Sequence, residues 1–178
     1  MPRGVAEGLA IVLIVVSAGA VACTPKRAAS SQEEYFEAAC AAWESLFRAV
    51  GNPDTASGSD LSRKLDEAVG AGDVTTAERA ATEIARELKV GREHVAVAAG
   101  WEPRTAVMAQ FDRLFAAFEA RNAAKLAAAR KDPDADDPQA AFERAGGLAA
   151  WTGMFEAARA AGGGAATDRQ CPNVPVTP

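Results

Sequence analysis

The sequence is poor in the side chains that most enzymes and metal sites use. It has one histidine, His94, and three cysteines among 178 residues. A lone histidine cannot build a zinc site by itself, and no serine stands near it in a nucleophile-elbow pattern. Lys and Arg are also outnumbered: the net charge is −5 and no basic cluster occurs, which argues against nucleic acid as a partner. We therefore expect a non-catalytic protein, with no cofactor and no bound metal, rather than an enzyme.

Beyond the first 22 residues the sequence lacks the alternation of apolar and polar residues that marks strands. Its apolar residues recur every three or four positions instead, which is the spacing of one face of a helix. This pattern predicts an all-α fold over residues 32–171, an antiparallel bundle of four or five helices. Gly146 and Gly147 are a possible break in the last helix, and Gly91 a possible bend or end of another. The residues expected to face inward include Phe36, Cys40, Trp43, Phe47, Val50, Leu65, Ile84, Leu88, Phe111, Phe115, Phe118, Phe142, Leu148, Trp151 and Phe155.

The start of the chain has the layout of an export signal. Met1 to Glu7 carries one cation, Arg3, and residues 9–16 form a short apolar core. Small residues fill positions 17–22 and lead to Cys23. A charged start, an apolar core and a small-residue exit together indicate a secretory signal peptide over residues 1–22.

The last residues of this signal, Gly-Ala-Val-Ala-Cys at positions 19–23, resemble the lipobox of bacterial lipoproteins. The resemblance implies that cleavage falls before Cys23 and that its thiol carries a diacylglyceryl group. The protein would then bind the membrane through this lipid and face outward from the cell membrane. An uncleaved helical anchor over residues 8–25, or plain secretion, remains the alternative.

Residues 23–31 have no apolar periodicity, so they predict a lipidated cysteine followed by a short flexible tether. Residues 172–178 form a Pro-rich tail. In its abundance of Ala, Gly and Arg, the chain is similar to small Ala-rich helical lipoproteins of high-GC Gram-positive bacteria. This likeness is compositional and implies no activity.

Two cysteines, Cys40 and Cys171, lie outside the signal. An exported domain meets oxidising conditions, so an even pair predicts a disulfide. The alternative is a reactive thiol, which usually needs a nearby histidine or a Cys-x-x-Cys pair. Neither accompanies these cysteines in the sequence, and we therefore expect the Cys40–Cys171 bridge.

An acidic loop is the one segment that suggests a metal ion. Asp132, Asp134, Asp136 and Glu143 match positions 1, 3, 5 and 12 of an EF-hand calcium loop. Position 6, however, is Asp137, where the turn requires glycine. The alternative, which we favour, is that Asp136 or Asp137 caps a helix whose first residue is Pro138.

Two classes of function remain. The first is an envelope module that binds a protein or a small apolar ligand, and the second is an enzyme built from dispersed carboxylates and arginines. The absence of a catalytic motif favours the first. Trp43 and Trp151 lie on helical stripes and are expected in the core, whereas Trp101 lies in a turn and is the tryptophan expected to be exposed.

Overall fold

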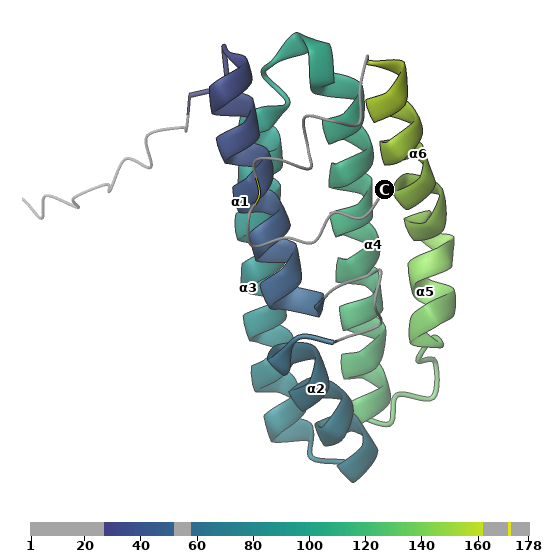
Figure 1. The fold of residues 1–178 in the computed structure, drawn as a ribbon. Helices are drawn as coiled ribbons and strands as arrows, with labels where there is room; N and C mark the ends of the chain where they lie inside the picture. The colour runs from purple at the N-terminus through teal and green to yellow at the C-terminus, as the bar shows by residue number, and fades with distance from the viewer. Residues whose placement is uncertain (1–26, 52–57, 162–170, 172–178) are drawn as a thin grey trace, which may run out of the picture.

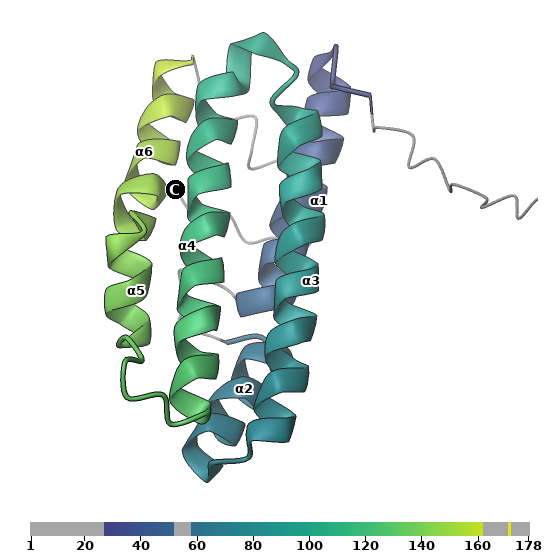
Figure 2. The same ribbon diagram turned by 180° about the vertical axis from the view of Figure 1, so that it is seen from behind.

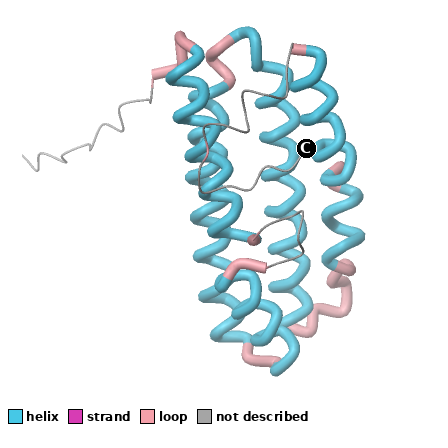
Figure 3. Tube along the Cα trace, viewed as in Figure 1, coloured by secondary structure: helices cyan, strands magenta, loops and turns pink. Residues whose placement is uncertain are grey.

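Every regular element in the described part of the chain is helical, which confirms the all-α prediction. The computed structural model describes residues 27–51, 58–161 and 171. Figure 3 shows helices joined by short loops in these ranges. The elements are α1 (Gln32–Val50), α2 (Asp60–Ala71), α3 (Val74–Ala98), the short 3-10 helix η1 (Glu102–Arg104), α4 (Thr105–Ala129), α5 (Pro138–Arg144) and α6 (Gly147–Ala160).

The helices form an elongated antiparallel bundle. In Figures 1 and 2, α1 packs across α3, α3 lies beside α4, and α4 lies between α3 and the α5–α6 pair. The chain runs down α1, up α3, down α4 and up α5 and α6. The short helix α2 follows α1 and closes the lower end of the bundle against α3 and α4. Within the described ranges the predicted four or five helices become six, because α5 and α6 are separate helices that follow one another along α4.

Side-chain caps fix where the helices begin. Ser31 precedes α1, and its hydroxyl accepts a hydrogen bond from the Glu34 N–H at 3.2 Å. Asp137 precedes α5 and accepts from the Ala140 N–H at 2.8 Å, with Pro138 in the first turn. Such oxygens satisfy N–H groups that have no partner within the helix. Asp137 is one of the two caps predicted above for this helix, and Ser31 and Glu34 have the spacing of a capping box in the sequence.

The deepest face of α1 differs from the predicted stripe. Its most buried residues are Tyr35, Ala42, Ser45, Leu46 and Ala49. Of the predicted stripe, Phe36 and Trp43 are buried, whereas Cys40, Phe47 and Val50 are only half-buried. The reason is the close packing of α1 on α3. A Cβ atom on Gly91 of α3 would lie 3.2 Å from the Ser45 Cβ and 2.3 Å from a ring carbon of Phe115. The small side chain of Ser45 therefore lies against Gly91 of α3. α3 continues unbroken through Gly91.

The predicted break at Gly146 and Gly147 is confirmed, but one inward prediction near it is wrong. Gly146 has φ 81°, a left-handed conformation that suits glycine, and α6 starts at the next residue. Leu148 is 56% exposed rather than buried. It lies two residues before the buried Ala150, about 200° around the helix, and therefore points outward.

Candidate functional site

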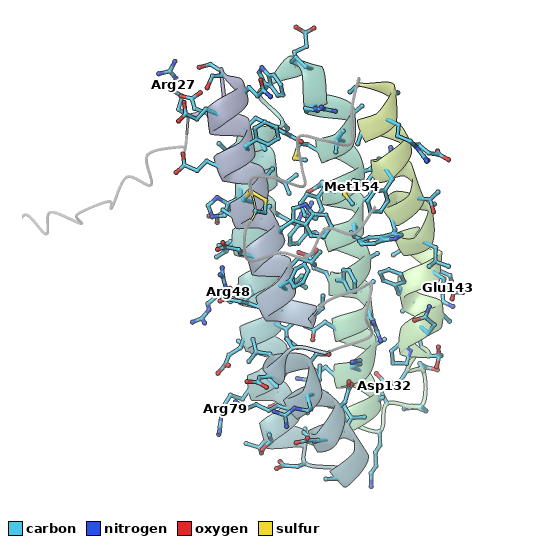
Figure 4. All side chains as sticks on the ribbon, viewed as in Figure 1. Arg27, Arg48, Arg79, Asp132, Glu143 and Met154 are labelled. Atoms are coloured by element: carbon cyan, nitrogen blue, oxygen red, sulfur yellow. A yellow bond between two sulfur atoms is a disulfide. The ribbon has the colours of Figure 1, made fainter. Side chains whose placement is uncertain are left out.

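Cys40 of α1 and Cys171 form the predicted disulfide. Their Cα atoms lie 5.3 Å apart, a separation typical of disulfides. Figure 4 shows the yellow bond beside α1. Cys171 also packs against the hydrophobic core. The bridge therefore ties a residue that follows α6 to α1 across a sequence separation of 131 residues.

The three tryptophans lie against other aromatic rings. The centroid of the Trp43 ring lies 4.5 Å from that of Phe111 and 6.1 Å from that of Trp151. Trp43 is also buried, which confirms that it belongs to the core. Trp151 is half-buried against the same core. The predicted exposure of Trp101 is wrong, because its ring is half-buried 5.1 Å from the ring of Tyr35. The turn that carries it folds back over the first turn of α1.

An open groove of about 340 Å³ lies between the start of the described chain, α1 and α3. Its polar residues come from three places in the sequence. Arg27 precedes α1, Glu34 and Glu37 belong to α1, and His94 belongs to α3. In Figure 4, Arg27 lies at the end of the bundle where α1 begins. The apolar part of its lining consists of Ala29, Ala38, Ala41 and Val97. We call this the Arg27–His94 groove.

One carboxylate of the groove also shapes the start of α1. Glu34 accepts hydrogen bonds from the Ser30 N–H at 2.6 Å and from the Ser30 hydroxyl at 2.9 Å. These bonds hold the pKa of the Glu34 carboxyl below its usual value, and the charge of Arg27 acts in the same direction. Glu34 therefore remains charged near neutral pH and cannot serve there as a general acid. Counting Arg27, Glu34 and Glu37, the groove carries a net negative charge.

The acidic loop does not assemble the four calcium ligands suggested by its sequence. Asp136 pairs with Arg144, and Glu143 accepts a hydrogen bond from the Gln139 amide at 2.8 Å. Asp132 accepts one from the Asp134 N–H at 3.0 Å. Among the described residues, no group of three His, Cys, Asp or Glu side chains could hold a metal ion. The loop side chains contribute to turns, a helix cap and an ion pair.

Ion pairs between helices are the feature that the sequence did not reveal. Arg92 of α3 contacts both oxygens of Asp112 on α4, at 2.8 and 3.1 Å, and Glu119 at 3.2 Å. The hydrogen bond to Asp112 raises the pKa of Arg92 above its usual value. The buried Lys125 pairs with Asp66 at 2.5 Å. These partners lie far apart in the sequence, so only the packing of the helices brings them together.

His94 lies in the last two turns of α3. It is half-buried in the wall of the Arg27–His94 groove. This groove could not be predicted from the sequence, because Glu34 and Glu37 are ordinary polar-face residues of α1. Their juxtaposition with His94, almost sixty positions later, arises from the packing of α1 on α3.

Comparison with known proteins adds no relative to this picture. No protein-family model, no curated protein and no solved structure matches the chain. Within the described ranges, no helix is both long enough and apolar enough to span a bilayer. The case for function therefore depends on the residues and geometry of the chain itself.

Proposed function

We propose that the protein is a lipoprotein of the bacterial cell envelope. Its signal peptide covers residues 1–22, and a lipid on Cys23 anchors it to the outward face of the cell membrane. Both segments lie outside the described residues, so the proposal about them depends on the sequence pattern. The disulfide between Cys40 and Cys171 is the observation that supports export most directly. Disulfides persist in oxidising compartments and are rare in the cytosol of most bacteria.

Replacing Cys23 tests the anchor. In a bacterial host labelled with palmitate, the wild-type protein should become labelled and lose residues 1–22. Cys23→Ser should remain unlabelled and accumulate as the precursor, because its hydroxyl cannot replace the thiol. Cys171→Ser is the matched control: it alters another cysteine and should be processed and labelled like the wild type. Normal processing and labelling of Cys23→Ser would contradict the proposal.

For the domain itself we propose a non-catalytic role in binding an envelope protein. The Arg27–His94 groove supports this role, since it is open and lined by charged side chains around an apolar floor. Such a lining suits a peptide segment better than a small apolar ligand. Its net negative charge favours a partner that presents Lys or Arg. Catalysis by dispersed carboxylates and arginines has less support, because Glu34 is engaged by Ser30 and Arg92 by Asp112.

Site-specific crosslinking tests this role. A photoreactive amino acid at Ala41, in the groove, should yield an adduct with one envelope protein in intact cells. The same amino acid at Ala149, exposed on α6, is the control and should not yield that adduct. Glu37→Lys should abolish the adduct at position 41 by reversing the charge of an exposed groove residue. Equal adducts at both positions, or an adduct insensitive to Glu37→Lys, would contradict binding in the groove.

A further inference from the structure

The first described residues are seated on the end of the bundle instead of extending into solvent. The Ala29 N–H donates a hydrogen bond to the Val97 carbonyl in the last turn of α3, at 2.9 Å. Only 3% of Ala29 is exposed. The predicted tether, residues 23–31, therefore contains a residue that belongs to the packed domain.

Two further features hold Ala29 in this position beside the end of α3. Gly100, just after α3, has no side chain where the segment passes: a Cβ there would lie 2.5 Å from the Ala28 Cβ and 3.0 Å from the Ala29 backbone. On the other side, Ser30 donates two hydrogen bonds to Glu34 and ties the segment to the first turn of α1. The chain thus enters the domain at one defined place, beside the end of α3.

We infer that this end of the bundle, at the tip formed by Gly100, Trp101 and η1, faces the membrane. The inference depends on the proposed lipidation of Cys23. From Cys23 to Ala29 the chain has six steps and reaches at most about 21 Å when fully extended. α3 and α4, with 25 residues each, are about 37 Å long. The tether is therefore shorter than the bundle, and the α2 end projects away from the bilayer.

The occupant of this surface is the head-group layer of the bilayer. The end presents the half-buried Trp101 and the exposed Glu102 and Pro103. Tryptophan suits the membrane interface, because its large apolar ring carries one hydrogen-bond donor. Exposed charges of both signs, Arg27, Glu33 and Glu102, lie at this end, so charge does not determine its preference for a bilayer surface. The short reach of the tether accounts for the orientation.

The tryptophans lie at two different levels along the bundle axis and can report which level contacts the membrane. The Trp101 ring lies 5.1 Å from that of Tyr35, in the first turns of α1. Trp43 lies eight residues beyond Tyr35, about 12 Å further along α1. The Trp151 ring is 6.1 Å from the Trp43 ring, so it marks the same level. Trp101 and Trp151 are both half-buried, which makes them a matched pair of reporters.

The test uses the full lipidated protein in phosphatidylcholine vesicles, with and without bromine near the head-group end of the acyl chains. Bromine quenches tryptophan emission at short range. The wild-type protein should lose emission in brominated vesicles, and Trp151→Phe should lose the same amount. Trp101→Phe should show no loss. Inserting ten Gly-Ser residues between Arg27 and Ala28 should also abolish the loss, since it lengthens the reach by about 33 Å.

Three outcomes would overturn the orientation. Loss that disappears in Trp151→Phe but persists in Trp101→Phe would place the middle of the bundle on the membrane. Loss that decreases equally in both variants would mean that the bundle lies on its side. If the wild-type protein lost no tryptophan emission in brominated vesicles, this end would not lie at the bilayer. Mass spectrometry and vesicle flotation check the lipid in each sample. A chain without lipid refutes the lipoprotein proposal too, whereas a lipidated chain with one of these patterns refutes only the orientation.

Discussion

Breaking the Cys40–Cys171 disulfide is expected to lower the free energy of unfolding by up to about 5 kcal/mol. The bridge joins residues 131 positions apart, so it restricts most of the chain in the unfolded state. The chain-entropy relation for a closed loop of that length gives about 5 kcal/mol at 25 °C. In a domain of this size, that loss corresponds to a decrease in Tm of roughly 10–20 °C.

The measurement is urea unfolding of the chain from Thr24 onward, followed by the helical circular dichroism signal. Three samples are compared: the oxidised protein, the same protein after reduction, and the double variant Cys40→Ala/Cys171→Ala. Reduction leaves every side chain in place, so it isolates the effect of the cross-link. The double variant adds the loss of two half-buried sulfur atoms. We expect the reduced protein and the double variant to agree within about 1 kcal/mol.

The dependence on urea provides a second readout of the same effect. An unfolded chain without the bridge exposes more surface, so the slope of free energy against urea should increase on reduction. A decrease of less than about 1 kcal/mol with an unchanged slope would refute the reasoning. It would mean that the unfolded chain remains equally compact with and without the link.

Three other changes have defined outcomes. Gly91→Ala places a methyl group 2.3 Å from the Phe115 ring and should cost about 1–3 kcal/mol in urea unfolding. Gly70→Ala in α2 is its control, because a Cβ added there would meet nothing within 4 Å, and it should raise stability by up to about 1 kcal/mol. Equal effects of the two variants on the free energy of unfolding would contradict the packing. Ser59→Ala removes both the cap of α2 and a bond to the Ala49 carbonyl, and should cost about 1–2 kcal/mol. Hydrogen bonds from Thr76 hold the pKa of Asp73 below its usual value, so the carboxylate stabilises the fold above the unfolded-state pKa and ceases to do so as pH falls through the folded-state pKa. The difference in Tm between wild type and Asp73→Asn should therefore shrink from pH 7 to pH 3, and a constant difference would refute this assignment.

The comparison of sequence and structure is clearest in α1. The sequence located its start, because Ser31 and Glu34 form a local cap that depends on neighbouring residues alone. It misjudged the deepest face, because apolar size was taken as the guide to burial. The close contact with α3 instead involves the small, fully buried Ser45, which lies opposite Gly91. Periodicity alone cannot indicate which side of a helix its nearest neighbour will occupy.

The site residues divide in the same way. The Cys40–Cys171 pair could be predicted, since only two cysteines remain once Cys23 is assigned to the proposed lipid site, and two cysteines have one possible pairing. The Arg27–His94 groove could not, since its residues are unremarkable until α1 and α3 pack together. Trp101 likewise looked exposed from its turn, and Tyr35 covers it only in the folded chain.

The sequence by itself determined the all-α class, the helix caps and the disulfide. It also carries the export and lipid signal that we propose for Cys23. These features depend on residue spacing, on local hydrogen bonds or on a single possible pairing. The tertiary structure alone decided that Ala29 is seated beside Gly100, which shortens the predicted tether. It also decided the composition of the groove and the pairing of Arg92 with Asp112. Contacts of this kind depend on the rotation and depth at which helices pack, which many distant side chains set together.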